Sequence, residues 1–220
     1  MAAHPPKGGL TYCGRMVARH ETHPGSAASA GPAEFRGAVE TMRTASLRPE
    51  VLCEEMPAPQ RIAPWSAALS GDVTVGEEDL GTGRIILLHD PAGNDAWDGT
   101  FRCVTYARAD LDPELGNDPM LAAVGWSWLT EALEAHGAAF HAISGTVTCV
   151  TTESFGGMAG EPGAAQLEIR ASWTPDVDED GALDMRAHVE AWGELLCTAV
   201  GLPPVPEGVT AIPSRRGQRG

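Results

Sequence analysis

Apolar residues recur at helical spacing in three segments of the chain. The widest apolar face belongs to residues 118–137, where Asp118 can cap the start and Gly137 can end the helix. The apolar positions of this central helix are Leu121, Val124, Trp128, Ala132 and Ala135. Amphipathic patterns also cover residues 32–46 and 183–200. The chain is therefore predicted to form three helices, with the central one packed on a sheet.

Alternating apolar and polar residues predict the strands of that sheet. The five predicted strands are residues 65–75, 80–88, 100–108, 140–152 and 165–174. Residues 48–64 contain four prolines and are read as an extended segment outside the central sheet. Short links favour antiparallel pairing, so we expect an α+β fold with a single antiparallel five-stranded sheet and helices on one side. The order α-βββ-α-ββ-α resembles that of small secretion chaperones, as an analogy of topology only.

The ends of the chain differ in composition from its middle. Residues 1–31 are rich in Ala, Gly, Pro and His without any period, which predicts a disordered N-terminal tail. Met16 is an alternative start within that tail. Residues 32–213 are expected to form a single α+β domain, and residues 214–220 a disordered basic C-terminal tail.

Charge and cysteine content narrow the function classes. The chain has 30 Asp and Glu against 15 Lys and Arg, a net charge of −15, which argues against general binding to nucleic acids or anionic membranes. No apolar run reaches the ~20 residues that span a bilayer. The five cysteines are widely spaced and form no C-x-x-C motif, which is typical of reduced thiols in a cytoplasmic protein.

Three motifs carry weak chemical signals. The run from Asp176 to Asp184 matches the first half of a calcium loop, but Ala187 stands where a bidentate Glu is needed, so a solvated acidic loop is favoured over weak calcium binding. Cys13, His20 and His23 lack a fourth metal ligand. The Gly-rich segment 155–163 leads into a strand, whereas phosphate-binding loops lead into a helix. None of these motifs supports a catalytic, cofactor or metal site.

The strongest candidate site is the polar loop HDPAGNDAWDG at residues 89–99. His89, Asp90 and Asp98 could perform acid–base work or hold a cation if the fold brought them together. The same residue types also build hairpin turns, which is the favoured interpretation. Trp97 is unusual in so polar a loop and favours contact with a protein partner.

Four segments of the sequence resemble a known family. They are PEVLCEEMPAPQRIAPWSAALS, GRIILLHDPAGNDAWDGTFRCVTYARADL, VGWSWLTEALEAHGA and VEAWGELLCTAVGLPPVPEGV. These segments are similar to an uncharacterised actinobacterial family catalogued as domain of unknown function three thousand. The resemblance covers residues 35–213 and implies a single-domain, cytoplasmic bacterial protein. It implies no activity, cofactor or catalytic residue.

These patterns favour a non-enzymatic binding or adaptor module, with a protein partner or a homodimer as its assembly. The rival hypothesis is an enzyme or small-molecule binder with a pocket near the 89–99 loop. A third hypothesis is an RNA-linked accessory role through the basic tail at Arg215, Arg216 and Arg219. The sequence alone does not identify the function.

Overall fold

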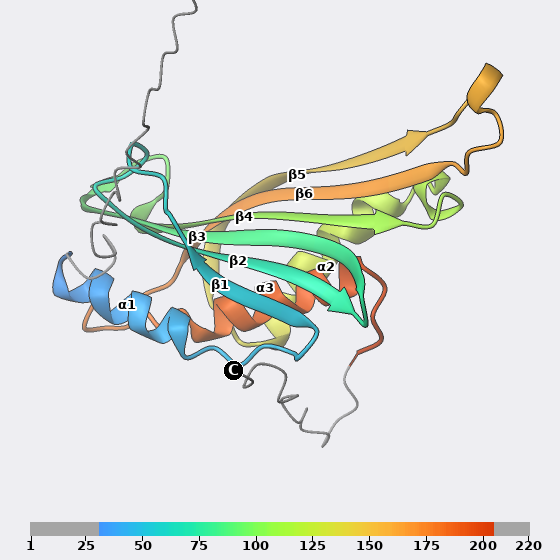
Figure 1. Ribbon diagram of the computed structural model, residues 1–220. Helices are drawn as coiled ribbons and strands as arrows, with labels where there is room; N and C mark the ends of the chain where they lie inside the picture. Colours follow the sequence, from blue (N-terminus) through green and yellow to red (C-terminus); the bar gives the residue numbers. More distant parts are fainter. Residues whose placement is uncertain (1–30, 205–220) are drawn as a thin grey trace, which may run out of the picture.

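The computed structural model describes residues 31–204 as an antiparallel sheet with helices on one face (Figure 1). The strands pair in the order β1-β2-β3-β4-β6-β5. In chain order the elements are α1 (Ala33–Arg43), β1 (Val51–Met56), β2 (Trp65–Val75), β3 (Glu78–Asn94), β4 (Gly99–Leu111), η2 (Leu115–Asn117), α2 (Leu121–Ala135), β5 (Phe140–Thr152), η3 (Gly156–Met158), β6 (Ala164–Pro175) and α3 (Arg186–Ala199). The two tails proposed from composition lie outside the described residues.

The prediction of five strands was wrong, because the sheet has six. The missing strand is β1, which lies between Pro49 and Pro57 and pairs with β2. Proline excludes a central strand because it cannot donate to the ladder, but β1 is an edge strand with the prolines outside its bounds. The element order is therefore α-ββββ-α-ββ-α, which is not the order on which the comparison with secretion chaperones was based.

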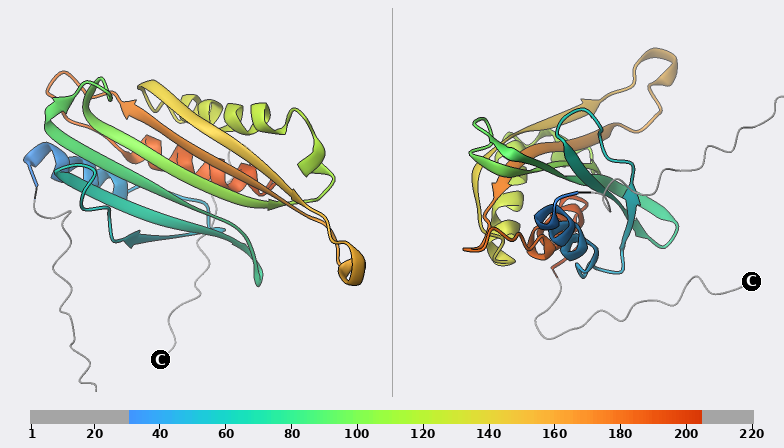
Figure 2. Two further views of the ribbon diagram at one scale, coloured as in Figure 1. Left: turned by 90° about the horizontal axis from the view of Figure 1, so that it is seen from above. Right: turned by 90° about the vertical axis from the view of Figure 1, so that its left-hand side faces the viewer.

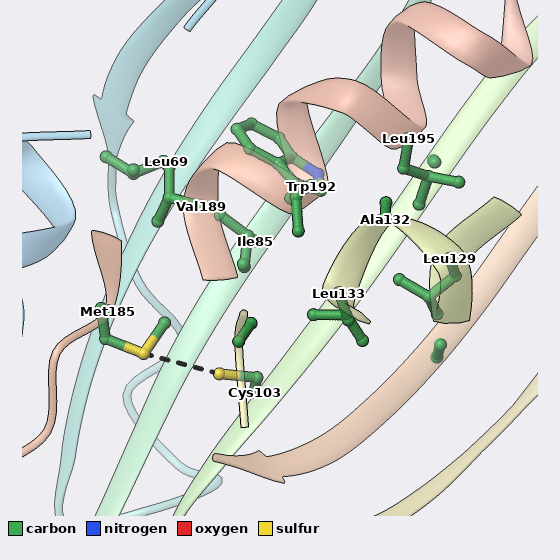
Figure 3. Close-up of a cluster of buried hydrophobic side chains, with 14 of the residues drawn as sticks. Leu69, Ile85, Cys103, Leu129, Ala132, Leu133, Met185, Val189, Trp192 and Leu195 are labelled. Carbon is green, nitrogen blue, oxygen red and sulfur yellow. Dashed lines mark hydrogen bonds between the residues drawn. The ribbon is translucent and has the colours of Figure 1, made fainter. Parts of the chain in front are cut away.

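The core lies between the sheet and α3, which crosses the middle strands (Figures 1 and 3). Odd-numbered residues of β2, β3, β4 and β6 face the helices, as the period of two requires. Trp192 of α3 is fully buried and lies over Gly71, whose added Cβ would come within 2.7 Å of the indole. The Cys103 thiol lies 3.8 Å from the Met185 sulfur at the base of this core.

The central helix begins two residues later than expected, because Met120 rather than Asp118 is the cap before its first residue, Leu121. Asp118 is not its N-cap residue, because its carboxylate accepts the amide of Met120 in the turn before the helix. The buried stripe is Leu121, Gly125, Leu129, Ala132 and Leu133, whereas Val124 is exposed and Trp128 is half-buried. Gly125 faces Leu167 of β6, which an added Cβ would meet at an ordinary contact distance of 3.4 Å, and the two tryptophans lie half-buried beside this stripe. Gly137 ends the helix at φ +67°, as expected.

The two edges of the sheet are β1 and β5. The hairpin of β5 and β6 continues beyond the helices, and its tip projects away from the body (Figures 1 and 2). We call residues 152–164 the arm, since almost all of them are exposed. α2 packs on the helix side of β5 and leaves its outer edge open (Figure 2).

Candidate functional site

The structure separates His89 from its acidic neighbours. His89 belongs to β3 and faces the helices, where its ring is 1% exposed between Phe35 and Phe101. Its Nδ1 lies 3.0 Å from the carbonyl of Thr100. Asp90 points to the opposite face because successive strand residues alternate, and its carboxylate accepts the amide of Ala92. The two side chains therefore cannot act on one substrate atom.

Trp97 and Asp98 lie in the tight turn between β3 and β4. The backbone carbonyl of Trp97 accepts a hydrogen bond from the Thr174 hydroxyl, and its indole is half-buried. Asp98 has a left-handed backbone, with φ +56°, and its carboxylate is exposed. The 89–99 segment thus forms a hairpin end, and its polar residues largely satisfy the turn.

His141, which sequence reasoning missed, connects this hairpin to the start of β5. Its Nε2 lies 3.0 Å from the carbonyl of Asp98, and its Nδ1 lies 2.5 Å from Asp176 Oδ1. A carbonyl only accepts, so Nε2 donates and the carboxylate stabilises a proton on Nδ1. The hydrogen bonds to Asp98 and Asp176 raise the pKa of His141. The ring ties three segments together beside the first residues of β5.

β5 is an exposed edge strand of 13 residues that contains no Asp, Glu, Lys or Arg. At about 3.3 Å per residue it presents roughly 40 Å of backbone. Most of its side chains are exposed, including those of Thr146, Thr148 and Val150. Proteins commonly protect such edges with charges, prolines or short strands, because an open row of N–H and C=O groups recruits other strands. Its one irregularity is a bulge between His141 and Ser144, close to the hairpin.

The arm carries two large apolar side chains in solvent. Phe155, just before the short helix η3, is 76% exposed, and Met158, the last residue of η3, is 62% exposed. Gly156 begins that helix with φ +63°, a backbone that favours glycine. The glycine-rich segment therefore forms a hairpin tip, as its position before a strand predicts, and it holds apolar groups where nothing in the described chain covers them.

Arg102 stabilises the same half of the sheet from its outer face. It is only 6% exposed and reaches from β4 across β6 to the bulge of β5, where its guanidinium donates to the carbonyl of Ala142 at 2.9 Å. It also donates to Thr174 Oγ1 at 3.0 Å and to Ser172 Oγ at 2.8 Å. Burial lowers the pKa of Arg102, and its partners are neutral oxygens. This network fixes the bulge and the first residues of β5.

The acidic loop after β6 uses its carboxylates for its own backbone. Asp178 Oδ1 accepts the amides of Asp180 and Ala182, at 3.0 and 2.7 Å, and Gly181 turns the chain at φ +78°. Across residues 31–204 no cluster of three or more His, Cys, Asp or Glu side chains could hold a metal ion. Calcium binding by this loop stays untested, and Cys13, His20 and His23 lie outside the described residues.

A cleft of about 610 Å³ lies between α1, the end of α2 and the acidic loop. It is not lined by His89, Asp90, Trp97 or Asp98. This cleft is therefore not the pocket expected near the 89–99 loop, and that pocket stays a prediction. The cleft is built mainly by small residues and carboxylates instead. Its lining includes Ala139, just before β5, and Asp176, which is hydrogen-bonded to His141 of β5.

A family comparison covers this whole architecture. The model described as "Protein of unknown function (DUF3000)" matches residues 31–210. The chain belongs to this family. The edge strand, the arm and the cleft all lie inside the matched region. No curated protein and no solved structure matches the chain.

Neither the edge strand nor the cleft is visible as a motif in the sequence. The bounds of β5 agree with the predicted strand 140–152, and the sequence itself shows that this strand lacks Asp, Glu, Lys and Arg. Its place at the edge depends on pairing with β6 rather than with the preceding strand, which is a long-range choice. No helix in residues 31–204 is long and apolar enough to cross a membrane.

Proposed function

We propose that this protein is a non-enzymatic protein-binding module whose partner adds an extended segment to the open edge of β5. The observation that carries the proposal is the length, exposure and lack of charge of that edge. Backbone hydrogen bonds along an edge strand supply affinity, and neighbouring side-chain contacts supply specificity. The exposed Phe155 and Met158 on the arm provide an apolar contact at one end of the strand.

The hairpin between β3 and β4 bounds the other end of the same edge. His141, at the start of β5, is bonded to the carbonyl of Asp98, and Trp97 is in the same turn. A bound segment would run from this hairpin to the arm. Trp97, Asp98 and Asp90 are thereby proposed as partner contacts at the hairpin, whereas the buried His89 supports the hairpin from inside.

Charge favours a different protein over a second copy as the partner. Each chain carries a net charge of −15, so two copies placed edge to edge repel each other. An extended segment flanked by basic residues would be attracted by the same charge. We therefore assign the edge to a heterologous partner with basic flanks, and a homodimer is the outcome that would revise this assignment.

The proposed site of action is the cytoplasm. Support comes from four free cysteines in the described chain, Cys53, Cys103, Cys149 and Cys197. Burial raises the pKa of Cys197 to about 11 and that of Cys103 further, so both remain thiols at neutral pH. Unpaired thiols of this kind suit a reducing compartment.

A pair of lysine substitutions tests the proposal. Thr148→Lys adds charge to the exposed β5, and Leu52→Lys adds the same charge to the exposed face of β1. Protein co-purified from its own cells should lose its partner with Thr148→Lys, at least about tenfold, because the edge must desolvate on pairing. Leu52→Lys should retain it.

Two further results separate this surface from others. Phe155→Ser on the arm should also weaken the complex, and Trp97→Ala should weaken it at the hairpin end. Equal loss with Thr148→Lys and Leu52→Lys would contradict an edge-specific partner. A symmetric dimer in native mass spectrometry, dissociated by Thr148→Lys, would keep the edge but replace the heterologous partner by a second copy.

A further inference from the structure

The cleft on the helix side combines a wall of small residues with a rim of carboxylates. Its wall includes Ala33, Gly37, Ala138, Ala139, Ala182 and Ala187. The carboxylates are Glu34 from α1 and Asp176, Asp178 and Asp184 from the loop that precedes α3. No Lys or Arg of the described chain lines it. A volume of about 610 Å³ is within the range of sites that hold small molecules.

Much of the acidic charge around the cleft is not neutralised by a cation of the described chain. Asp176 Oδ1 is already hydrogen-bonded to His141 Nδ1 at 2.5 Å. Asp178 and Asp184 each use one oxygen to accept backbone amides, which orients the carboxylate without removing its charge. Asp184 also has Arg186 at 3.9 Å, on the exposed side. Glu34 has His89 Nε2 at 3.5 Å as its nearest partner.

His188 provides an independent indication that the cleft holds a ligand. It lines the cleft, yet the residue is only 2% exposed. Its Nδ1 accepts the indole N–H of Trp173 at 3.2 Å, which places the proton of the neutral ring on Nε2. Nε2 forms no hydrogen bond within residues 31–204, and it is not among the unpartnered side-chain nitrogens that are sealed from solvent. Because Nδ1 is directed to the core, the Nε2–H donor is left toward the cleft.

Gly37 lines the cleft without a side chain, although a glycine is not needed at this position of α1. It lies inside α1, where glycine destabilises a helix by about 0.5–1 kcal/mol relative to alanine. An added Cβ would meet no atom within 4 Å, so no neighbour demands the glycine. The missing side chain widens the cleft instead.

We propose that this cleft binds a small organic cation, an alkyl guanidinium or amine that also carries a carbonyl. Glu34, Asp178 and Asp184 supply the negative charge around the cationic group, and the carbonyl accepts the His188 Nε2–H. A metal ion does not fit the site, because the described carboxylates and histidines form no group of three close enough to share one. An anion does not fit either, because every charged side chain in the lining is acidic. No residue of β5 lines this cleft.

Argininamide is the probe that matches this chemistry, and citrullinamide is its neutral counterpart of nearly the same shape. Calorimetry on the full chain should give a dissociation constant near or below about 1 mM for argininamide, and binding at least about tenfold weaker for citrullinamide. In nitrogen-15 NMR, argininamide should shift the His188 Nε2 resonance, which a ligand bound elsewhere on the acidic surface would leave in place.

Three variants locate the binding. Gly37→Leu fills the cleft and should weaken argininamide at least about tenfold while raising the melting temperature. Glu34→Gln should weaken it about threefold, as one exposed charge contributes. Glu134→Gln removes the same charge from the exposed side of α2 and should have no effect. Thr148→Lys, which disrupts the proposed edge, should also leave argininamide binding unchanged.

Several results would overturn the proposal. They are the absence of binding at 10 mM argininamide (about ten times the expected constant), equal affinity for citrullinamide, and equal effects of Glu34→Gln and Glu134→Gln. Unchanged binding by a folded Gly37→Leu protein would also overturn it. If that variant fails to fold, the Glu34→Gln and Glu134→Gln pair and the His188 resonance decide the question.

Discussion

The two edges of one sheet are built in opposite ways. β1 has six residues, lies between prolines and carries Glu54 and Glu55, one of which is bonded to Arg43 of α1 at 2.6 Å. β5 has 13 residues, no Asp, Glu, Lys or Arg, and a hairpin arm at its end. Charge and shortness protect an edge against added strands, so only β1 has the features of a closed edge.

The helices also pack differently on the two halves of the sheet. On the β1 side, the fully buried Trp192 lies over Gly71. On the β5 side, the half-buried Trp126 lies over Gly145, whose added Cβ would come within 2.7 Å of the indole. Both contacts use a glycine to admit an aromatic ring, but only one is sealed from solvent. β5 is therefore held in place mainly by its pairing with β6 and by the hydrogen bonds of Arg102, and less by the buried core.

The largest expected effect is a loss of stability when the buried tryptophan on the β1 side is truncated. Trp192→Ala should lower the free energy of unfolding by about 3–5 kcal/mol, because a large cavity opens in the core. Trp126→Ala should cost about 1–2 kcal/mol, since its ring is partly solvated already. Urea denaturation of the two variants measures both values. Equal losses would mean that the β5 half is as tightly packed as the β1 half.

A smaller effect concerns His188, whose buried ring accepts the indole N–H of Trp173 in β6. Burial lowers the pKa of His188 from 6.5 to about 4. Between pH 6.5 and pH 4 the unfolded chain therefore binds a proton at this residue, whereas the folded chain does not. The free energy of unfolding falls as the pH is lowered from 6.5 toward 4. This amounts to about 3 kcal/mol.

The variant His188→Gln keeps an acceptor for Trp173 and removes the titration. Denaturation between pH 4 and pH 7 should show a flatter profile for the variant than for the wild type. Parallel profiles would show that the buried ring is not the group that titrates in this range.

The smallest expected effects are opposite pH dependences of the stability of the two edges. The hydrogen bond and charge of Arg43 lower the pKa of Glu55, so this support of β1 is present above about pH 4.5 and is lost as the pH falls through the folded value. The pKa of His141 is raised, so its support of β5 is complete below pH 6.5 and is lost as the pH rises through its folded value. Each contribution is below about 1 kcal/mol, because the groups are exposed.

Amide exchange resolved by residue can separate these two contributions. Protection near Glu55 should fall in acid, and protection near His141 should fall at alkaline pH. Arg43→Gln and His141→Gln should each remove only its own dependence. A variant that alters both edges together would indicate a global change in stability instead.

Local patterns in the sequence predicted most of the elements but not their arrangement. The alternation in residues 65–75 and 140–152 gave the bounds of β2 and β5, because period and composition are local properties. β1 was missed because its flanking prolines were taken to exclude a central strand, and an edge strand was not considered. The order β4-β6-β5 depends on long-range pairing, which no local pattern specifies. The polar loop was expected to bring His89 and Asp90 together, but β3 extends through both residues. Alternation along the strand buries His89 and turns Asp90 outward.

Residue-resolved hydrogen exchange of the full chain, free and bound to the partner recovered from its own cells, tests the central claim most directly. The proposed pairing predicts new protection in β5 amides between residues 144 and 152, little change in β1, and loss of that protection in Thr148→Lys. Protection confined to β1 or to the helices, with β5 exchanging as in the free protein, would contradict the assignment of β5 as the binding edge.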